Sequence, residues 1–145
     1  MRGVAEDSEE YRIQKACVED WERQGYKVHW PHRDTEQKDP ERGTGICRTT
    51  FWGIVNANEV RVRFDPTSEG FVADLMMTFV LNELGKVWGL QGIIGCRKVV
   101  IVNPKAVEQK IKEEVEEQVK KGIDPKFAKS YTMVLKNLAD ETANL

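Results

Sequence analysis

The sequence has too few cysteines, too widely spaced, for a disulfide framework or a structural zinc site. Cys17, Cys47 and Cys96 are odd in number, lie far apart and form no C-x-x-C pair. Disulfide scaffolds need paired cysteines, and zinc sites need cysteine and histidine at short spacing. We therefore expect three reduced thiols, as in a cytoplasmic protein.

A strong excess of charge of either sign is also missing. The chain has 22 basic and 24 acidic residues, a net charge of −2 and an isoelectric point near 5.8. This balance argues against a basic face for nucleic acid polymers and favours a small-molecule partner.

Long apolar runs are absent as well. No charged segment followed by an apolar stretch opens the chain, and no run approaches the ~18 residues that a membrane span needs. We expect no membrane partner and no export. His29 and His32 are the only histidines, and they lack acids at ligand spacing, so the sequence predicts neither a metal site nor a cofactor.

The chain does contain an alternation of helical and strand patterns, which we interpret as a single domain over residues 1–145. Apolar spacing predicts helices over 9–24, 46–57, 69–84 and 105–121, and a last helix with Asp124 as N-cap and Pro125 at its first position. Apolar runs predict strands over 26–30, 59–64 and 97–102. Helices between strands indicate parallel crossovers, and hence an α/β fold: a Rossmann- or flavodoxin-like three-layer sandwich with a short, mainly parallel sheet.

In such sheets ligands bind beyond the carboxyl ends of the strands. Loops 31–45 and 65–70 follow the first two predicted strands. The polar residues that we expect at this edge are His32, Arg33, Asp34, Ser68, Gly70 and Asp74. The turn DPTSEG before the helix suits an anion such as phosphate; alternatively, it is only a capped helix start.

One segment resembles a known family. Residues 57–81, ANEVRVRFDPTSEGFVADLMMTFVL, are similar to a segment of the nucleoside 2-deoxyribosyltransferases, nearest the deoxynucleoside-monophosphate N-glycosidase branch. The family segment runs alanine–aspartate, strand, [DS]-x-G turn, then a glutamate four residues after the glycine. The likeness extends over residues 9–103 only as generic α/β patterning.

The resemblance implies cleavage or transfer at the N-glycosidic bond of a nucleotide. Breaking this bond develops positive charge on the sugar, which a carboxylate stabilises as nucleophile or electrostatic partner. Asp74 occupies that position. Ser68 and Gly70 match the turn that binds a 5′-phosphate, Asn58 stands where the family handles the base, and the 31–45 loop carries further ligand-binding residues.

Two positions depart from the family. Asp74 replaces a glutamate, which withdraws the carboxylate by ~1.5 Å, and a ~1 Å displacement of a reacting group costs on the order of 100-fold in rate. Asn58 replaces an aspartate, and a proton donor is worth ~100- to 10,000-fold. Glu59 or Asp34 are candidates to take over the acid role. The alternative function is a catalytically inactive nucleotide-binding or oligomeric assembly module of the same fold.

Family members begin with a central strand, which the short polar stretch 1–7 does not provide. Either the natural chain begins further upstream, or 26–30 pairs directly with 59–64. A missing strand exposes edge hydrogen bonds and apolar surface that a partner subunit covers. We therefore expect a homo-oligomer.

Three further patterns allow two interpretations each. RGTG at 42–45 cradles an anion or, as we favour, forms a flexible hinge. Trp30, Trp52 and Trp88 stack on a base or, as we favour, pack in the core. The charge-dense 105–121 stretch is most simply a solvated helix face, and its four-spaced valines alternatively line a contact between subunits.

Overall fold

The computed structural model describes residues 8–87 and 95–145. The chain divides into two compact units, Met1–Gly53 and Ile54–Leu145. The expectation of a single domain stays a prediction, and Trp88 lies outside the described residues.

The first unit begins with helix α1, Glu9–Arg23, as the apolar spacing predicts. The hydroxyl of Ser8 accepts a hydrogen bond from the backbone N–H of Tyr11 at 3.1 Å and so caps the helix. Gly25 follows the helix with φ of 94°, in the left-handed region that glycine adopts without strain.

The predicted strand over 26–30 is wrong: the structure places no strand there. Helix α2, Pro31–Asp34, follows at once. The Asp34 carboxylate accepts from the backbone N–H of Trp30 at 2.7 Å, and Arg33 donates to the carbonyl of Val28 at 2.9 Å. Side chains therefore bond to backbone groups that a neighbouring strand would otherwise pair with. Trp30 is buried, as predicted.

The loop before the next helix encloses a carboxylate. Asp39 accepts hydrogen bonds from the backbone N–H groups of Glu41 (2.9 Å), Gly43 (2.9 Å) and Ile46 (3.1 Å). Gly43 takes φ of 102° to bring its N–H inward. The RGTG stretch therefore helps to bind an anion, and this anion belongs to the chain itself; the flexible hinge stays a prediction.

Helix α3 spans Thr44–Val55, two residues earlier than predicted. Ile54 is buried, whereas the side chain of Trp52 is 56% exposed. The prediction that Trp52 packs in the core is therefore wrong.

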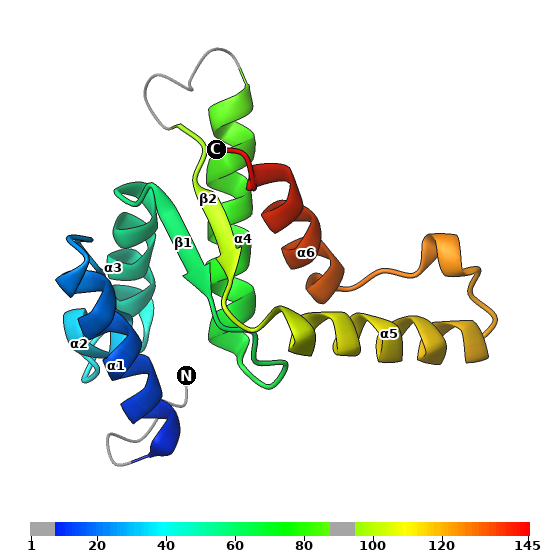
Figure 1. Cartoon of the computed structure of the whole chain (residues 1–145), viewed down its shortest axis with the longest axis horizontal. Helices are drawn as coiled ribbons and strands as arrows, with labels where there is room; N and C mark the ends of the chain where they lie inside the picture. The colour runs from blue at the N-terminus through cyan, green and yellow to red at the C-terminus, as the bar shows by residue number, and fades with distance from the viewer. Residues whose placement is uncertain (1–7, 88–94) are drawn as a thin grey trace. The chain divides into compact units, whose positions relative to one another are not determined.

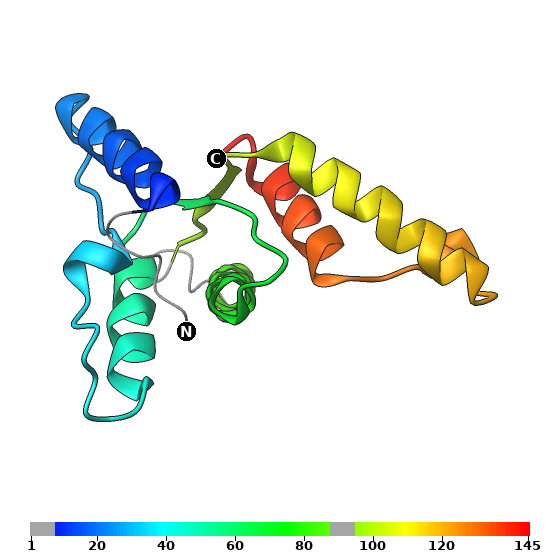
Figure 2. The same ribbon diagram turned by 90° about the horizontal axis from the view of Figure 1, so that it is seen from below.

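The second unit contains a two-stranded parallel sheet, which confirms a mixed α/β fold with parallel pairing. Strand β1, Glu59–Val62, pairs with β2, Lys98–Ile101, in a register that sets Glu59 beside Lys98. Helix α4, Glu69–Lys86, lies between them in the chain and runs beside the sheet (Figure 1). Figure 2 shows α4 almost end-on.

Two helices follow the sheet. Helix α5 spans Pro104–Lys120 and α6 spans Tyr131–Thr142. Between them Asp124 and Pro125 begin only a single 3-10 turn, η2, Pro125–Phe127. The predicted start of the last helix at Asp124 is thus wrong, because the Ser130 hydroxyl provides the cap by accepting from the N–H of Met133 at 3.2 Å.

The core lies where α4, α5 and α6 meet the sheet. Its buried apolar side chains come from α4, β2, α5, α6 and the loop after β1: Phe64, Leu75, Val99, Val107, Leu135 and Leu138. Phe71 packs against this cluster, edge-on to Phe64 at 5.4 Å between ring centroids. In the described part of the chain no helix is long and apolar enough to cross a membrane.

Side-chain amides extend the short sheet at both ends. At one end, the Asn82 amide accepts from the N–H of Arg97 at 2.8 Å and donates to its carbonyl at 2.9 Å. At the other, the Asn103 amide pairs in the same way with the N–H and carbonyl of Phe64 at 2.8 and 3.0 Å. Each asparagine thus replaces a peptide group of a missing strand neighbour.

The Arg97 side chain is 2% exposed and binds backbone carbonyls at the end of α3. Its guanidinium donates to the carbonyls of Ile54 at 2.6 Å, Val55 at 2.8 Å and Gly95 at 2.9 Å. A cation at a helix C-terminus also compensates the negative end of the helix dipole. Arg97 therefore joins residues 54 and 55 to the start of β2, within the second unit.

Replacing Arg97 by Met should lower the free energy of unfolding by roughly 3–5 kcal/mol, because one buried and two half-buried carbonyls lose their donor. Urea denaturation followed by circular dichroism measures the change. The exposed Arg12 provides the matched control, and Arg12→Met should change stability by less than about 0.5 kcal/mol. Equal effects of the two substitutions would contradict this role.

Candidate functional site

The turn before α4 is organised by its own side chains. The Asp65 carboxylate accepts from the N–H and hydroxyl of Thr67 at 2.9 and 2.7 Å. The Ser68 hydroxyl accepts from the N–H of Phe71 at 3.3 Å, which makes Ser68 the N-cap of α4. The interpretation as a capped helix start therefore describes this turn. Gly70 lies in the first turn of α4, where backbone N–H groups have no partner within a helix.

Helical periodicity places Asp74 on the buried face of α4. Positions four, seven and eleven residues further on are Thr78, Leu81 and Gly85, and all three are buried. Residues at these spacings lie on one side of a helix. Asp74 itself is half-buried, since it lies closer to the start of the helix.

The Asp74 carboxylate is desolvated without compensation. Burial alone raises the pKa of Asp74 to about 6. Within the described part of the chain, no hydrogen bond or ion pair reaches its carboxylate; the bond at this residue joins its backbone carbonyl to the Thr78 hydroxyl at 2.8 Å. A carboxyl in such surroundings exchanges protons near neutral pH, as catalytic acids and bases do.

Asn58 lies immediately before β1, at the amino end of the strand. Its carbonyl accepts from the N–H of Lys98 at 3.0 Å and so extends the ladder. The residue is exposed. Next to it, Glu59 forms an ion pair with Arg61, so the first of the two candidate replacement acids already has a cationic partner.

Arg33 and Asp34 bind each other on α2. The guanidinium of Arg33 contacts both carboxylate oxygens of Asp34, at 2.7 and 3.0 Å, and the carboxylate of Glu22 at 2.9 Å. The hydrogen bond from Arg33 holds the pKa of Asp34 below its ordinary value, so Asp34 is unsuited to donate a proton near neutral pH.

His32, also on α2, is half-buried and lies edge-on to two aromatic rings. Its ring centroid is 5.8 Å from that of Trp30 and 6.3 Å from that of Tyr11. This aromatic cluster gives His32 a packing role in the first unit.

The predicted site residues therefore fall into two groups. Ser68, Gly70 and Asp74 share α4, and Asn58 belongs to the same unit. Residues 32–34 belong to the other unit. The expectation that all of them gather at one edge of a sheet stays a prediction.

Two polar centres were not found from the sequence. One is the Asp39 carboxylate within the RGTG loop, for which the signal was an aspartate four to six residues before closely spaced glycines. The other is the buried pair of Arg97 and Asn82. Asn82 in the apolar stretch of α4 and Arg97 before an apolar strand were the available signals, because buried polar groups require partners.

The described residues contain no group of three histidine, cysteine, aspartate or glutamate side chains that is able to hold a metal ion.

Asp74→Asn should make the protein more stable at neutral pH. Between pH about 4 and 6 the folded state retains a proton on Asp74 that the unfolded state has released, so the free energy of unfolding falls as pH rises through this range. The amide resembles the protonated acid and has no such dependence. We expect equal stabilities near pH 4, and an advantage of about 1–3 kcal/mol for the variant at pH 7.5.

Urea denaturation at both pH values measures this difference. Glu108, which is exposed on α5, provides the control. Glu108→Gln should follow the wild-type pH dependence. A constant difference between the wild type and Asp74→Asn at both pH values would show that Asp74 is not desolvated.

Comparison of the chain with protein-family models, with curated protein sequences and with solved structures found no match.

Proposed function

We propose that this protein cleaves or transfers the N-glycosidic bond of a nucleotide or a related N-riboside, with Asp74 as the carboxylate that meets the developing sugar cation. One observation carries the proposal: Asp74 is half-buried on the inner face of α4 and its carboxylate has no hydrogen-bond partner among the described residues. Its pKa is raised to about 6. A desolvated carboxylate stabilises an adjacent positive charge more strongly than a solvated one does.

The start of α4 supplies the second part of the proposal. In this scheme, the N–H groups of the first turn and the Ser68 hydroxyl bind a 5′-phosphate at the positive end of the helix dipole. The hydroxyl accepts one bond from Phe71, and it keeps its own hydrogen for a phosphate oxygen. Asn58 would then hydrogen-bond the base.

We further propose that the two-stranded sheet belongs to a reduced three-layer sandwich of the deoxyribosyltransferase-like family. The parallel order β1–α4–β2 supports this interpretation. The free thiols of Cys17, Cys47 and Cys96 support a cytoplasmic location.

The second candidate is a nucleotide-binding or assembly module without catalysis. The exposed Asn58 in place of an acid favours it. The state of Asp34 favours it as well, because Arg33 holds this carboxylate ionised. The predicted positions then supply no proton donor for the base.

Purified protein incubated with a panel of deoxynucleotides and ribonucleotides should release free base, measured by chromatography. The rate should rise about tenfold per pH unit below pH 6 and level off above it, because the nucleophile must be ionised. Asp74→Ala should abolish release, whereas the control Glu108→Gln, at an exposed acid on α5, should not. Nucleotide binding by calorimetry without base release would assign the protein to the second candidate.

Restoring the family residues provides an independent test. Asp74→Glu extends the carboxylate by ~1.5 Å and should raise the rate of base release by on the order of 100-fold. Asn58→Asp adds a proton donor and should raise it by ~100-fold or more. The double variant should release base faster than either single variant. If no variant gains activity while all of them bind nucleotide, the assigned roles are wrong.

A further inference from the structure

The end of the α5–α6 hairpin exposes an apolar ridge. We call residues 119–131 the hairpin tip. Four large apolar side chains of the tip are exposed: Val119 (42%), Ile123 (39%), Phe127 (73%) and Tyr131 (55%). Figures 1 and 2 show the second half of α5 extending past the start of α6.

The ridge continues the buried stripe of α5. Val107 is 1% exposed, Ile111 and Val115 are half-buried, and Val119 is 42% exposed. The exposure of this stripe thus increases along α5. The reason is that α6 begins beside the middle of α5, where the hydroxyl of Thr132 donates to Glu114 at 3.2 Å, so α6 does not cover the second half of α5.

The tip is rigid. The Gln118 side chain donates to the carbonyl of Lys129 at 3.0 Å and accepts from its N–H at 3.1 Å. The Asp124 carboxylate accepts from the N–H of Lys126 at 2.9 Å. Phe127 therefore lies on a hydrogen-bonded turn, which reduces the ordering entropy lost when a partner buries it.

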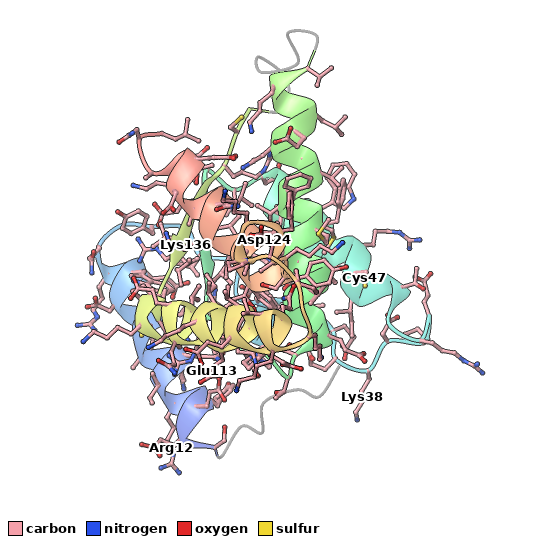
Figure 3. The ribbon with its side chains drawn as sticks, turned by 90° about the vertical axis from the view of Figure 1, so that its right-hand side faces the viewer. Arg12, Lys38, Cys47, Glu113, Asp124 and Lys136 are labelled. Atoms are coloured by element: carbon pink, nitrogen blue, oxygen red, sulfur yellow. The ribbon has the colours of Figure 1, made fainter. Side chains whose placement is uncertain are left out.

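Charge is segregated along the same hairpin. Residues 113–117 contain four glutamates and no basic residue, and we call them the acidic segment. Residues 120–129 contain four lysines and one aspartate. Figure 3 looks onto this end of the molecule and shows Glu113 on α5 and Asp124 in the turn beyond it.

These charges select one arrangement of two copies. A tip placed against a tip sets lysines against lysines, and a parallel arrangement sets glutamates against glutamates. An antiparallel pair with its two-fold axis near Gln118 places the acidic segment opposite the lysines of the partner, because the glutamates precede Gln118 in the chain and the lysines follow it. A two-fold interface requires such a self-complementary surface.

We propose that the hairpin tip is a dimer interface with a second copy of this chain. Phe127 of each copy packs against the apolar ridge of the other copy, at Val119 on α5. The lysines of each tip lie against the acidic segment of the partner. The proposal is independent of the chemistry assigned to Asp74.

Sedimentation velocity over about 10–500 µM, the range in which small interfaces associate, should show a monomer–dimer equilibrium. Phe127→Ser should raise the dissociation constant at least about tenfold. Leu145 is exposed to a similar degree, 64%, and Leu145→Ser should leave association unchanged. Salt at about 1 M should weaken the dimer, since it screens charge pairs. Circular dichroism should confirm that each variant keeps the wild-type helix content.

A charge exchange tests the arrangement itself. The pair Lys126→Glu with Lys129→Glu, and the pair Glu113→Lys with Glu116→Lys, should each raise the dissociation constant about tenfold or more. Mixing these two variants should restore a dimer close to the wild type in affinity, because both contacts are then complementary again. A monomeric wild type, a dimer that Phe127→Ser leaves intact, or a mixture no stronger than its components would overturn the proposal. Monomeric protein that sediments with phosphatidylserine vesicles would assign the tip to a membrane surface instead.

Discussion

Backbone hydrogen bonding is the constraint on which the second unit depends. Two parallel strands of four residues each leave many N–H and carbonyl groups without a ladder partner, and such a small sheet is not stable alone. Side chains meet this need: the amides of Asn82 and Asn103 pair with backbone at the two ends of the sheet. On the outer edge of β2, the hydroxyl of Thr142 in α6 accepts from the N–H of Val99 at 2.9 Å. The helices are thereby fixed to the sheet by directional bonds as well as by apolar packing.

The same packing explains the properties of Asp74. Leu75 and Thr78, one and four residues further along α4, are each 2% exposed, and the regular helix that buries them also turns Asp74 toward the interior. The raised pKa of Asp74 is thus a consequence of helix geometry. Keeping the ionised carboxylate half-buried at neutral pH lowers the free energy of unfolding. A position that costs stability without a structural partner is where function is to be sought.

Periodic patterns predicted most elements, because the apolar spacing of α1, α4 and α5 reflects the faces they bury. The prediction of a strand at 26–30 was wrong, because a short apolar run does not reveal that Asp34 and Arg33 bond to its backbone. The predicted start of α6 was wrong, because Asp124–Pro125 suits a 3-10 turn as well as a helix. For the candidate site, the sequence predicted the helix that carries Asp74 and the turn at Ser68 that caps it. It did not show that Arg33 and Asp34 bind each other, since that depends on side-chain geometry.

The bond between Val99 and Thr142 spans 43 residues of chain. At ribosomal elongation rates of 5–20 residues per second, residue 142 is joined to the chain roughly 2–9 s after residue 99. During that interval β2 has no hydroxyl on its outer edge, although β1 and α4 have already been synthesised. The outer edge of β2 therefore lacks its bonding partner on α6 for seconds during synthesis.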